Sequence, residues 1–155
     1  MADSAPEFLT GQFVGEGHIE TFTANAALTK GDVVKIVTAD RSVSVSVSND
    51  KSIGVALKTV SANQQVPVLV FGKTKLLAGA AITRGAALKA VTKTAGNGVV
   101  VSAVNTVTIP SGATAVTSTS AQPSMTVESG IALGVALDSA AADGDAFLAL
   151  INGVG

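Results

Sequence analysis

The sequence has no cysteine and a single histidine, His18. Without cysteine, neither a disulfide nor a thiolate metal site can form. A lone histidine without a second ligand is far more often an ordinary polar residue than a base or a metal ligand. No serine stands in a Gly-x-Ser-x-Gly elbow, and no phosphate-binding glycine loop ends in Lys-Ser or Lys-Thr. We therefore predict that the chain is not an enzyme and has no catalytic, cofactor-binding or metal-binding residues, and no cofactor.

Tryptophan and tyrosine are also absent, and the five aromatic residues are all phenylalanine. All ten Lys and Arg lie within residues 30–93, where Phe71 is the only aromatic residue. Single-stranded nucleic acid is usually bound by stacking bases on aromatic rings in a basic groove, so we expect no nucleic-acid partner. Apolar runs such as residues 130–137 are far shorter than the ~18 residues of a membrane span. Residues 1–15 lack the basic and long apolar segments of a signal peptide, so we expect synthesis in the cytoplasm and no membrane partner.

Hydrophobic residues make up 47% of the 155-residue sequence, so its core must consist of Val, Ala, Leu and Ile. Abundant Val and Thr, together with 16 Gly, favour strands and turns over helices. Only 14% of the residues are charged, which is typical of a surface that packs against neighbouring molecules. We predict a single all-β domain that works in a homo-oligomer.

The charges are unevenly distributed along the chain. Residues 1–29 carry a net charge of −4, residues 30–93 carry +7, and residues 94–155 carry −4. Acidic ends that meet a basic middle across a subunit boundary would explain this segregation. Neutralisation of the middle by the ends of the same chain explains it equally well, and the sequence leaves both open.

An internal repeat organises the sequence. The segment ALTKGDVVKIVT at residues 27–38 aligns with AITRGAALKAVT at residues 81–92, 54 positions later. The segment IGVAL at residues 53–57 aligns with LGVAL at residues 133–137, 80 positions later. The chain is therefore predicted to consist of two copies of one unit, with 26 extra residues in the second copy.

The 80-residue offset is predicted to continue without a gap into the strands at residues 66–70 and 146–150. The sequence ADGD at residues 142–145 is a hairpin-turn signal, whereas its counterpart at residues 63–65 lacks a glycine. Turn chemistry explains the two carboxylates of this segment, which are the one close acidic pair in the sequence.

Local patterns predict the strands. Residues 42–48 alternate Val and Ser, which is typical of a strand with one buried face. The small Gly and Ala of the two GVAL segments leave room for close backbone approach, as at a bulge or a tight barrel corner. Gly31 and Gly85 lie at turns where glycine adopts a positive φ without strain. Pro67 predicts that the strand at residues 66–71 lies at a sheet edge, or that the proline lies at the strand start.

Two segments lie outside this repeat. Residues 1–23 are predicted to be an extended N-terminal arm whose apolar residues anchor it to a partner, and these are Phe8, Leu9, Phe13 and Phe22. An arm folded back over its own barrel is the alternative. An insertion at about residues 97–122 is predicted to be a protruding hairpin or long loop. The domain at residues 24–155 then contains repeat unit 1 at about residues 26–72 and repeat unit 2 at about residues 80–151.

Six motifs follow one another in a fixed order over about residues 26–151. They are ALTKGDVV (27–34), IGVAL (53–57), VPVLVFG (66–72), AITRGAAL (81–88), LGVAL (133–137) and GDAFLALI (144–151). In this order they resemble the family of tailed-phage capsid cement, or decoration, proteins, once catalogued as a domain of unknown function. The arm and the insertion depart from the family pattern.

The resemblance implies a compact β-barrel or β-tulip-like body, usually a homotrimer, made in the host cytoplasm and located in the virion. Such a protein binds the major capsid protein on the outer capsid surface and clamps neighbouring capsomers against internal pressure. Its strength would come from several linked contacts, each of them modest. On this hypothesis, the four apolar residues of the arm bind the capsid.

Two other classes of function remain open. The first is a surface- or carbohydrate-binding β module of a head fibre or adhesin. The absence of Trp and Tyr counts against it, because sugars usually stack on aromatic rings. The second is an accessory domain of an enzyme, of the β-clip kind, whose Thr-x-Gly-Asp turns look similar.

Overall fold

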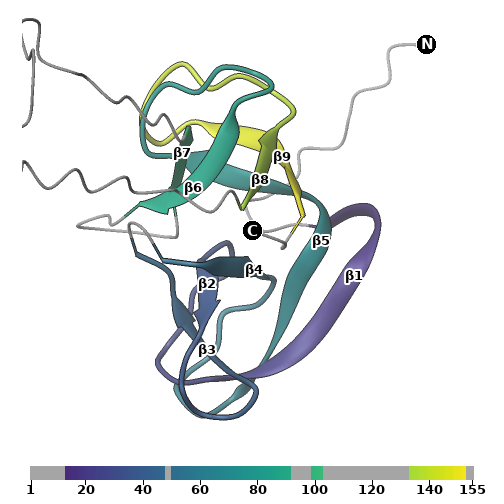
Figure 1. The fold of residues 1–155 in the computed structure, drawn as a ribbon, viewed down its shortest axis with the longest axis vertical. Coiled ribbons are helices and arrows are strands. Elements are labelled where there is room, and N and C mark those ends of the chain that lie inside the picture. Colours follow the sequence, from purple (N-terminus) through teal and green to yellow (C-terminus); the bar gives the residue numbers. More distant parts are fainter. Residues whose placement is uncertain (1–12, 48–49, 92–98, 103–132, 153–155) are drawn as a thin grey trace, which may run out of the picture.

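The computed structural model describes residues 13–47, 50–91, 99–102 and 133–152, with only the backbone described for residues 13–16 and 99–102. Within these residues the chain forms nine strands and no helix, so the all-β prediction is confirmed (Figure 1). The strands are β1 Phe13–Ala24, β2 Val33–Ile36, β3 Ser42–Val45, β4 Ser52–Ala56, β5 Gln65–Ala78, β6 Ala87–Val91, β7 Val99–Ser102, β8 Gly134–Ala136 and β9 Ala146–Ile151.

The strands form one mixed sheet in the order β1-β3-β2-β4-β5-β7-β6-β8-β9. Two further pairings, β1 with β5 and β5 with β9, close this sheet into two rings. The first barrel contains β1, β2, β3, β4 and β5, and the second barrel contains β5, β6, β7, β8 and β9. In Figure 1 the barrels are two lobes, and the long strand β5 passes from one into the other. This architecture agrees with the predicted barrel-like body built from two related halves.

Strand β5 is fourteen residues long, and different parts of it contribute buried side chains to the two barrels. Val66 and Val68 belong to the core of the first barrel, whereas Leu76 and Ala78 belong to the cluster that fills the second. Gly72 lies where the strand begins to pair with β9, and its φ of 137° is a conformation that favours glycine. The chain can therefore bend at this point without losing its pairing.

Each barrel has its own apolar core. The cluster in the first barrel contains Ala24, Leu28, Val34, Val43, Ala56, Val60, Val66 and Val68. A larger cluster fills the second barrel and also takes in Val33, Val55 and Leu69 from the first. Phe147 is the only aromatic residue among the described buried residues, so the expectation of an aliphatic core is confirmed.

The pairing pattern of the first barrel recurs in the second. The first barrel contains the strand pairs Thr23–Gln65, Leu28–Val60 and Lys35–Ser44. The corresponding pairs of the second barrel, in the same order, are Leu77–Ala146, Ile82–Ala140 and Lys89–Val101. A side-chain contact is repeated too. The backbone N–H of Lys30 donates to Thr59 Oγ1 at 3.0 Å, and that of Arg84 donates to Ser139 Oγ at 3.1 Å.

The repeat begins earlier than the sequence blocks indicate. Strand β1 pairs with β5 as the second part of β5 pairs with β9, so β1 is part of repeat unit 1. The predicted boundary of the arm at residue 23 is therefore wrong, and residues 1–12 lie outside the described residues. Sequence comparison misses this match because Ala24 and Ala78 are the only identical pair between residues 17–24 and 71–78.

Strand β7 falls inside the predicted insertion at residues 97–122. It pairs with β5 and β6 as β3 pairs with β1 and β2, so it belongs to the second barrel and this boundary is also wrong. Ser44 corresponds to Val101, 57 positions later, which puts 3 of the 26 extra residues before β7 and 23 after it. The remainder of the predicted insertion lies outside the described residues.

The turns before the last strand of each unit differ by one residue. The pair Val55–Leu69 recurs as Val135–Leu150, so the offset rises from 80 to 81 and the predicted gapless alignment is wrong. Asn63 adopts a φ of 65° where Gly144 adopts 89°. Asparagine tolerates this left-handed conformation better than most residues, which is why the first turn needs no glycine.

Two strand predictions are resolved by the structure. Pro67 is the third residue of β5, which pairs on both sides, so its place near a strand start is correct and the edge position is wrong. In β3, Val43 is buried as expected, but Val45 is 36% exposed while Ser46 beyond the strand is 2% exposed. Ser46 is accommodated because its hydroxyl lies 2.7 Å from the hydroxyl of Ser52 in a buried hydrogen bond.

Gly54 and Gly134 lie where a neighbouring strand comes closest, as predicted. A Cβ on Gly134 would collide with the carbonyl oxygen of Leu150, and one on Gly54 would collide with that of Leu69. We expect Gly134→Ala to lower the free energy of unfolding by about 2–4 kcal/mol, because backbone cannot move aside cheaply. Chemical denaturation followed by circular dichroism measures this change, since the chain has no Trp or Tyr fluorescence.

Gly144→Asn is the matched control for this prediction. Gly144 has a positive φ but open space around its Cβ position, and Asn63 occupies the equivalent conformation. The substitution should change the free energy of unfolding by less than about 1 kcal/mol. Equal losses in the two variants would show that close backbone approach is not what selects Gly134.

The segment that follows β7 provides a second prediction. Because its counterpart in unit 1 is 23 residues shorter, deletion of residues 106–128 should leave a folded protein with a similar melting temperature. Replacement of residues 97–122 by a short turn should instead lower the melting temperature, because it removes the whole of β7, which pairs with β5 and β6. Circular dichroism melts of both variants test this, and equal melting temperatures would contradict the role assigned to β7.

Candidate interaction surfaces

The structure separates the four residues predicted to bind a partner. Phe8 and Leu9 lie outside the described residues. Phe13 is the first residue of β1, and only its backbone, which pairs with Thr74 of β5, is described. Phe22 is partly buried and packs against the core of the first barrel. The guanidinium carbon of Arg41 lies 5.7 Å from the centre of the Phe22 ring. Phe22 is therefore a structural residue of the barrel.

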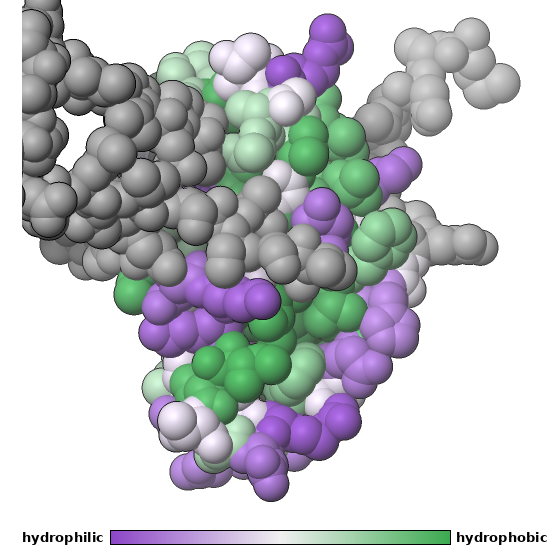
Figure 2. Space-filling view, viewed as in Figure 1, coloured by the Kyte–Doolittle hydropathy of each residue, from purple (hydrophilic) through white to green (hydrophobic). Residues whose placement is uncertain are grey.

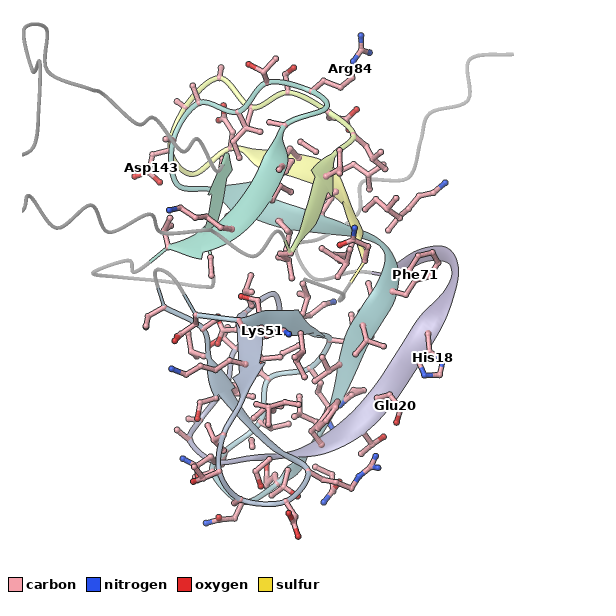
Figure 3. The ribbon with its side chains drawn as sticks, in the orientation of Figure 1. His18, Glu20, Lys51, Phe71, Arg84 and Asp143 are labelled. Atoms are coloured by element: carbon pink, nitrogen blue, oxygen red, sulfur yellow. The ribbon has the colours of Figure 1, made fainter. Side chains whose placement is uncertain are left out.

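A mixed polar and apolar patch lies on β1 and β5. Phe71 is 52% exposed and Ile19 is 44% exposed, and His18 is the strand partner of Phe71. Figure 3 shows His18, Glu20 and Phe71 along the same side of the first barrel. We call Ile19, Phe71, His18 and Glu20 the β1–β5 patch. Exposed apolar residues beside charged ones suit a docking surface better than a reaction site.

Glu20 links the polar part of this patch. Its carboxylate lies 2.8 Å from His18 Nε2 and accepts a hydrogen bond from the Arg41 guanidinium at 3.4 Å. Arg41 also donates to the carbonyl oxygen of Thr21 at 3.0 Å. The hydrogen bond with His18, followed by that with Arg41, lowers the pKa of Glu20 below its usual range. These exposed groups orient one another and build no enclosed site.

An open hollow lies on the first barrel, lined by Lys35, Ile36, Val37, Thr38, Asp50 and Lys51. Ile36 is 57% exposed here, and Lys35 Nζ lies 2.8 Å from Asp50 Oδ2. Figure 2 shows hydrophobic residues gathered over β2 and β3 below a hydrophilic band. Because the hollow is shallow and open, it is suited to contact with a broad surface rather than to enclosing a small ligand.

The carboxylate of Asp145 serves the fold. The same carboxylate oxygen of Asp145 accepts hydrogen bonds from the backbone N–H groups of Ala141 and Ala142, each at 2.9 Å, which confirms its predicted turn role. Within the described residues, no group of three or more His, Asp or Glu could hold a metal ion. In the same part of the chain, no helix is long and apolar enough to cross a membrane.

Sequence analysis missed the exposure of Phe71 and Ile36. A signal for Phe71 existed, since Val66 and Val68 set the inward positions of β5 and Phe71 falls on the opposite alternation. For Ile36 the signal was its counterpart Ala90, because a large apolar residue replaced by a small one marks different surroundings in the two barrels.

Comparisons with known proteins support the fold. No family model matches the chain, and no curated protein matches it significantly. Among solved structures, the chain is similar to the N base of the head fibre gp8.5 of bacteriophage phi29, with a TM-score of 0.55 and 18% sequence identity. The match covers 88% of this chain and 95% of the other. The similarity therefore extends over almost the whole of both folds.

The ion pair in the hollow gives a prediction on pH. Burial alone would raise the pKa of Asp50, but hydrogen bonds from Lys35 and the Val47 N–H outweigh it, so the pKa is lowered. Because the folded-state pKa is below the unfolded one, this stabilisation is complete above the usual Asp value and is lost as pH falls. We expect Asp50→Asn to lower the free energy of unfolding by about 0.5–1.5 kcal/mol at pH 7.

Denaturation of both proteins between pH 7 and pH 2 tests this. The difference between them should shrink below about pH 4, where the carboxylate becomes protonated. Asp40→Asn, at an exposed position between β2 and β3, is the control and should show little change. A difference for Asp50→Asn that stays constant down to pH 2 would contradict a role for the charge.

Proposed function

We propose that this chain is a non-enzymatic structural protein of a phage head that binds the outer surface of the capsid. The observation that carries the proposal is the match of fold to the base of a phage head fibre over almost its whole length. The ordered motifs of the sequence, which resemble those of capsid cement proteins, support the same class of function independently.

In the finer form of this proposal, the protein is a cement that joins neighbouring capsomers. Two barrels that share β5 present separate outer surfaces on one body, so one copy can contact more than one capsid subunit. Linking modest contacts raises the overall affinity by orders of magnitude over each contact alone. The partner is the major capsid protein, and the protein works as a homo-oligomer, with a trimer as the first choice.

The N-terminal arm is still proposed to contact the capsid, but it is shorter than the sequence predicted. Residues 13–24 form β1, which closes the first barrel, so the part left to reach a partner is residues 1–12 with Phe8 and Leu9. Burying a Phe side chain in a partner contributes roughly 2 kcal/mol, so these two residues would dominate a small contact.

The second candidate is the base of a fibre, which attaches another polypeptide or a binding module to the head. The neighbour's description as a head-fibre base favours it. Capsid binding is common to both candidates, but a cement raises the resistance of the head to heat or osmotic shock by itself. A fibre base leaves that resistance unchanged.

Titration of purified, undecorated heads with the protein tests the proposal. We expect saturable decoration of the heads, and Phe8→Ala should weaken binding by about 30-fold, which corresponds to roughly 2 kcal/mol. Deletion of residues 2–12 should abolish decoration without a change in melting temperature, because β1 is retained.

Phe22→Ala and His18→Ala are the controls for this experiment. Phe22→Ala should lower the melting temperature, because Phe22 packs against the core. His18→Ala should leave both properties unchanged, because Phe8 and Leu9, and not the β1–β5 patch, are proposed to contact the capsid. Unaltered decoration by the deletion variant would remove the arm from the interface. Failure of the full chain to bind heads of its own phage would contradict the proposed function itself.

A further inference from the structure

Corresponding residues of the two barrels differ in burial, and the difference indicates how the barrels meet. Val33, Val55 and Leu69 point out of the first barrel, since their neighbours in the chain, Val34, Ala56 and Val68, fill its core. All three are nevertheless fully buried, within the cluster that fills the second barrel. They lie side by side on β2, β4 and β5, and we call them the outer face of the first barrel.

The second barrel has the same outer face, made by Ala87, Val135 and Leu150. These residues also lie side by side, on β6, β8 and β9. Ala87 is exposed, and Val135 and Leu150 are only partly buried. This face therefore remains apolar and accessible where its counterpart is covered.

The ends of the barrels show the opposite difference. Ala90, Leu133 and Ile151 lie at one end of the second barrel and are at most 3% exposed, in the cluster that contains the outer face of the first. Their counterparts at the equivalent end of the first barrel are Ile36, Ile53 and Val70. Ile36 is 57% exposed, and the other two are only partly buried. We call these two sets the mouths of the barrels.

The two barrels are therefore not related by a two-fold axis. A two-fold axis would bury both outer faces equally, because each residue would meet its own counterpart. Instead, the outer face of the first barrel packs against the mouth of the second, in a head-to-tail contact. Among the described residues, the contact leaves two surfaces without a counterpart contact, which are the mouth of the first barrel and the outer face of the second.

We propose that these two surfaces bind each other between copies of this chain. The outer face of the second barrel of one copy would cover the mouth of the first barrel of the next copy, and so continue the contact already made inside each chain. The proposal concerns self-association alone and holds whatever else the protein binds.

The sizes of the residues on these surfaces support this pairing. Inside the chain the larger residue, Val33, is on the outer face and the smaller, Ala90, is in the mouth. On the unpaired surfaces the larger residue, Ile36, is in the mouth and the smaller, Ala87, is on the outer face. Counted over all six residues, the contact inside the chain and the two remaining surfaces each contain one Ala, two Val and three Leu or Ile. The combined apolar volume is therefore the same, which is what a well-packed contact requires.

A head-to-tail contact has a property that distinguishes it from a two-fold contact. Each copy uses two different surfaces, so the assembly closes into a ring or grows as an open chain. A variant that loses one surface still has the other intact. Two variants that have each lost a different surface can therefore form a dimer together, although neither self-associates alone.

Ile36→Lys and Ala87→Lys test the proposal, because both positions are exposed and tolerate a long polar side chain in the monomer. In sedimentation velocity or native mass spectrometry, the full chain should assemble with increasing concentration. Each variant alone should remain monomeric, with a dissociation constant raised by roughly a hundredfold or more. An equimolar mixture of the two variants should form dimers and nothing larger.

Phe71→Lys is the matched control, since Phe71 is similarly exposed and lies outside both surfaces. It should assemble like the full chain, and unchanged melting curves should show that all variants are folded. The proposal is overturned by a full chain that stays monomeric, by assembly that survives both variants, or by a mixture that stays monomeric. The last result would assign the contact to a two-fold interface or to another segment of the chain.

Discussion

The whole architecture depends on one strand with two sets of partners. Strand β5 closes the first barrel through β1 and β4, and it closes the second through β7 and β9. Closure satisfies backbone donors and acceptors that an open sheet would present at its edges. Loss of β5 would open both rings at once, so the two barrels are expected to unfold together.

The two barrels are linked by the shared strand β5 and, in addition, by apolar packing between them. Leu69 points out of the first barrel yet is fully buried, and it joins the cluster that contains Phe147 of the second. The chain therefore behaves as one body rather than as two modules on a linker. Rigidity of this kind suits a protein that links separate contacts, because little conformational freedom is lost when the second contact forms.

Much of the fold could be predicted from residues whose identity is fixed by the backbone. Gly54 and Gly134 lie under a neighbouring carbonyl, and Gly31 and Gly85 have φ values of 96° and 85°. Identity is lost where only backbone pairing is required, as between β3 and β7, in which Val43 and Val100 are the only identical pair. The repeat was therefore visible at its turns, whereas its extension into β1 and β7 was not.

The surfaces were harder to predict than the core, because composition does not say which apolar residues are covered. Three of the five Phe lie in residues 1–23, yet Phe22 supports the core while Phe71, within the repeat, is exposed. A duplicated fold shows which apolar residues are covered by other parts of the molecule, since each residue has a counterpart in the same local position. A difference in burial between two counterparts is therefore caused by contacts that one of them makes outside its own barrel. By that comparison, the exposure of Ile36 marks a surface whose equivalent already has a partner.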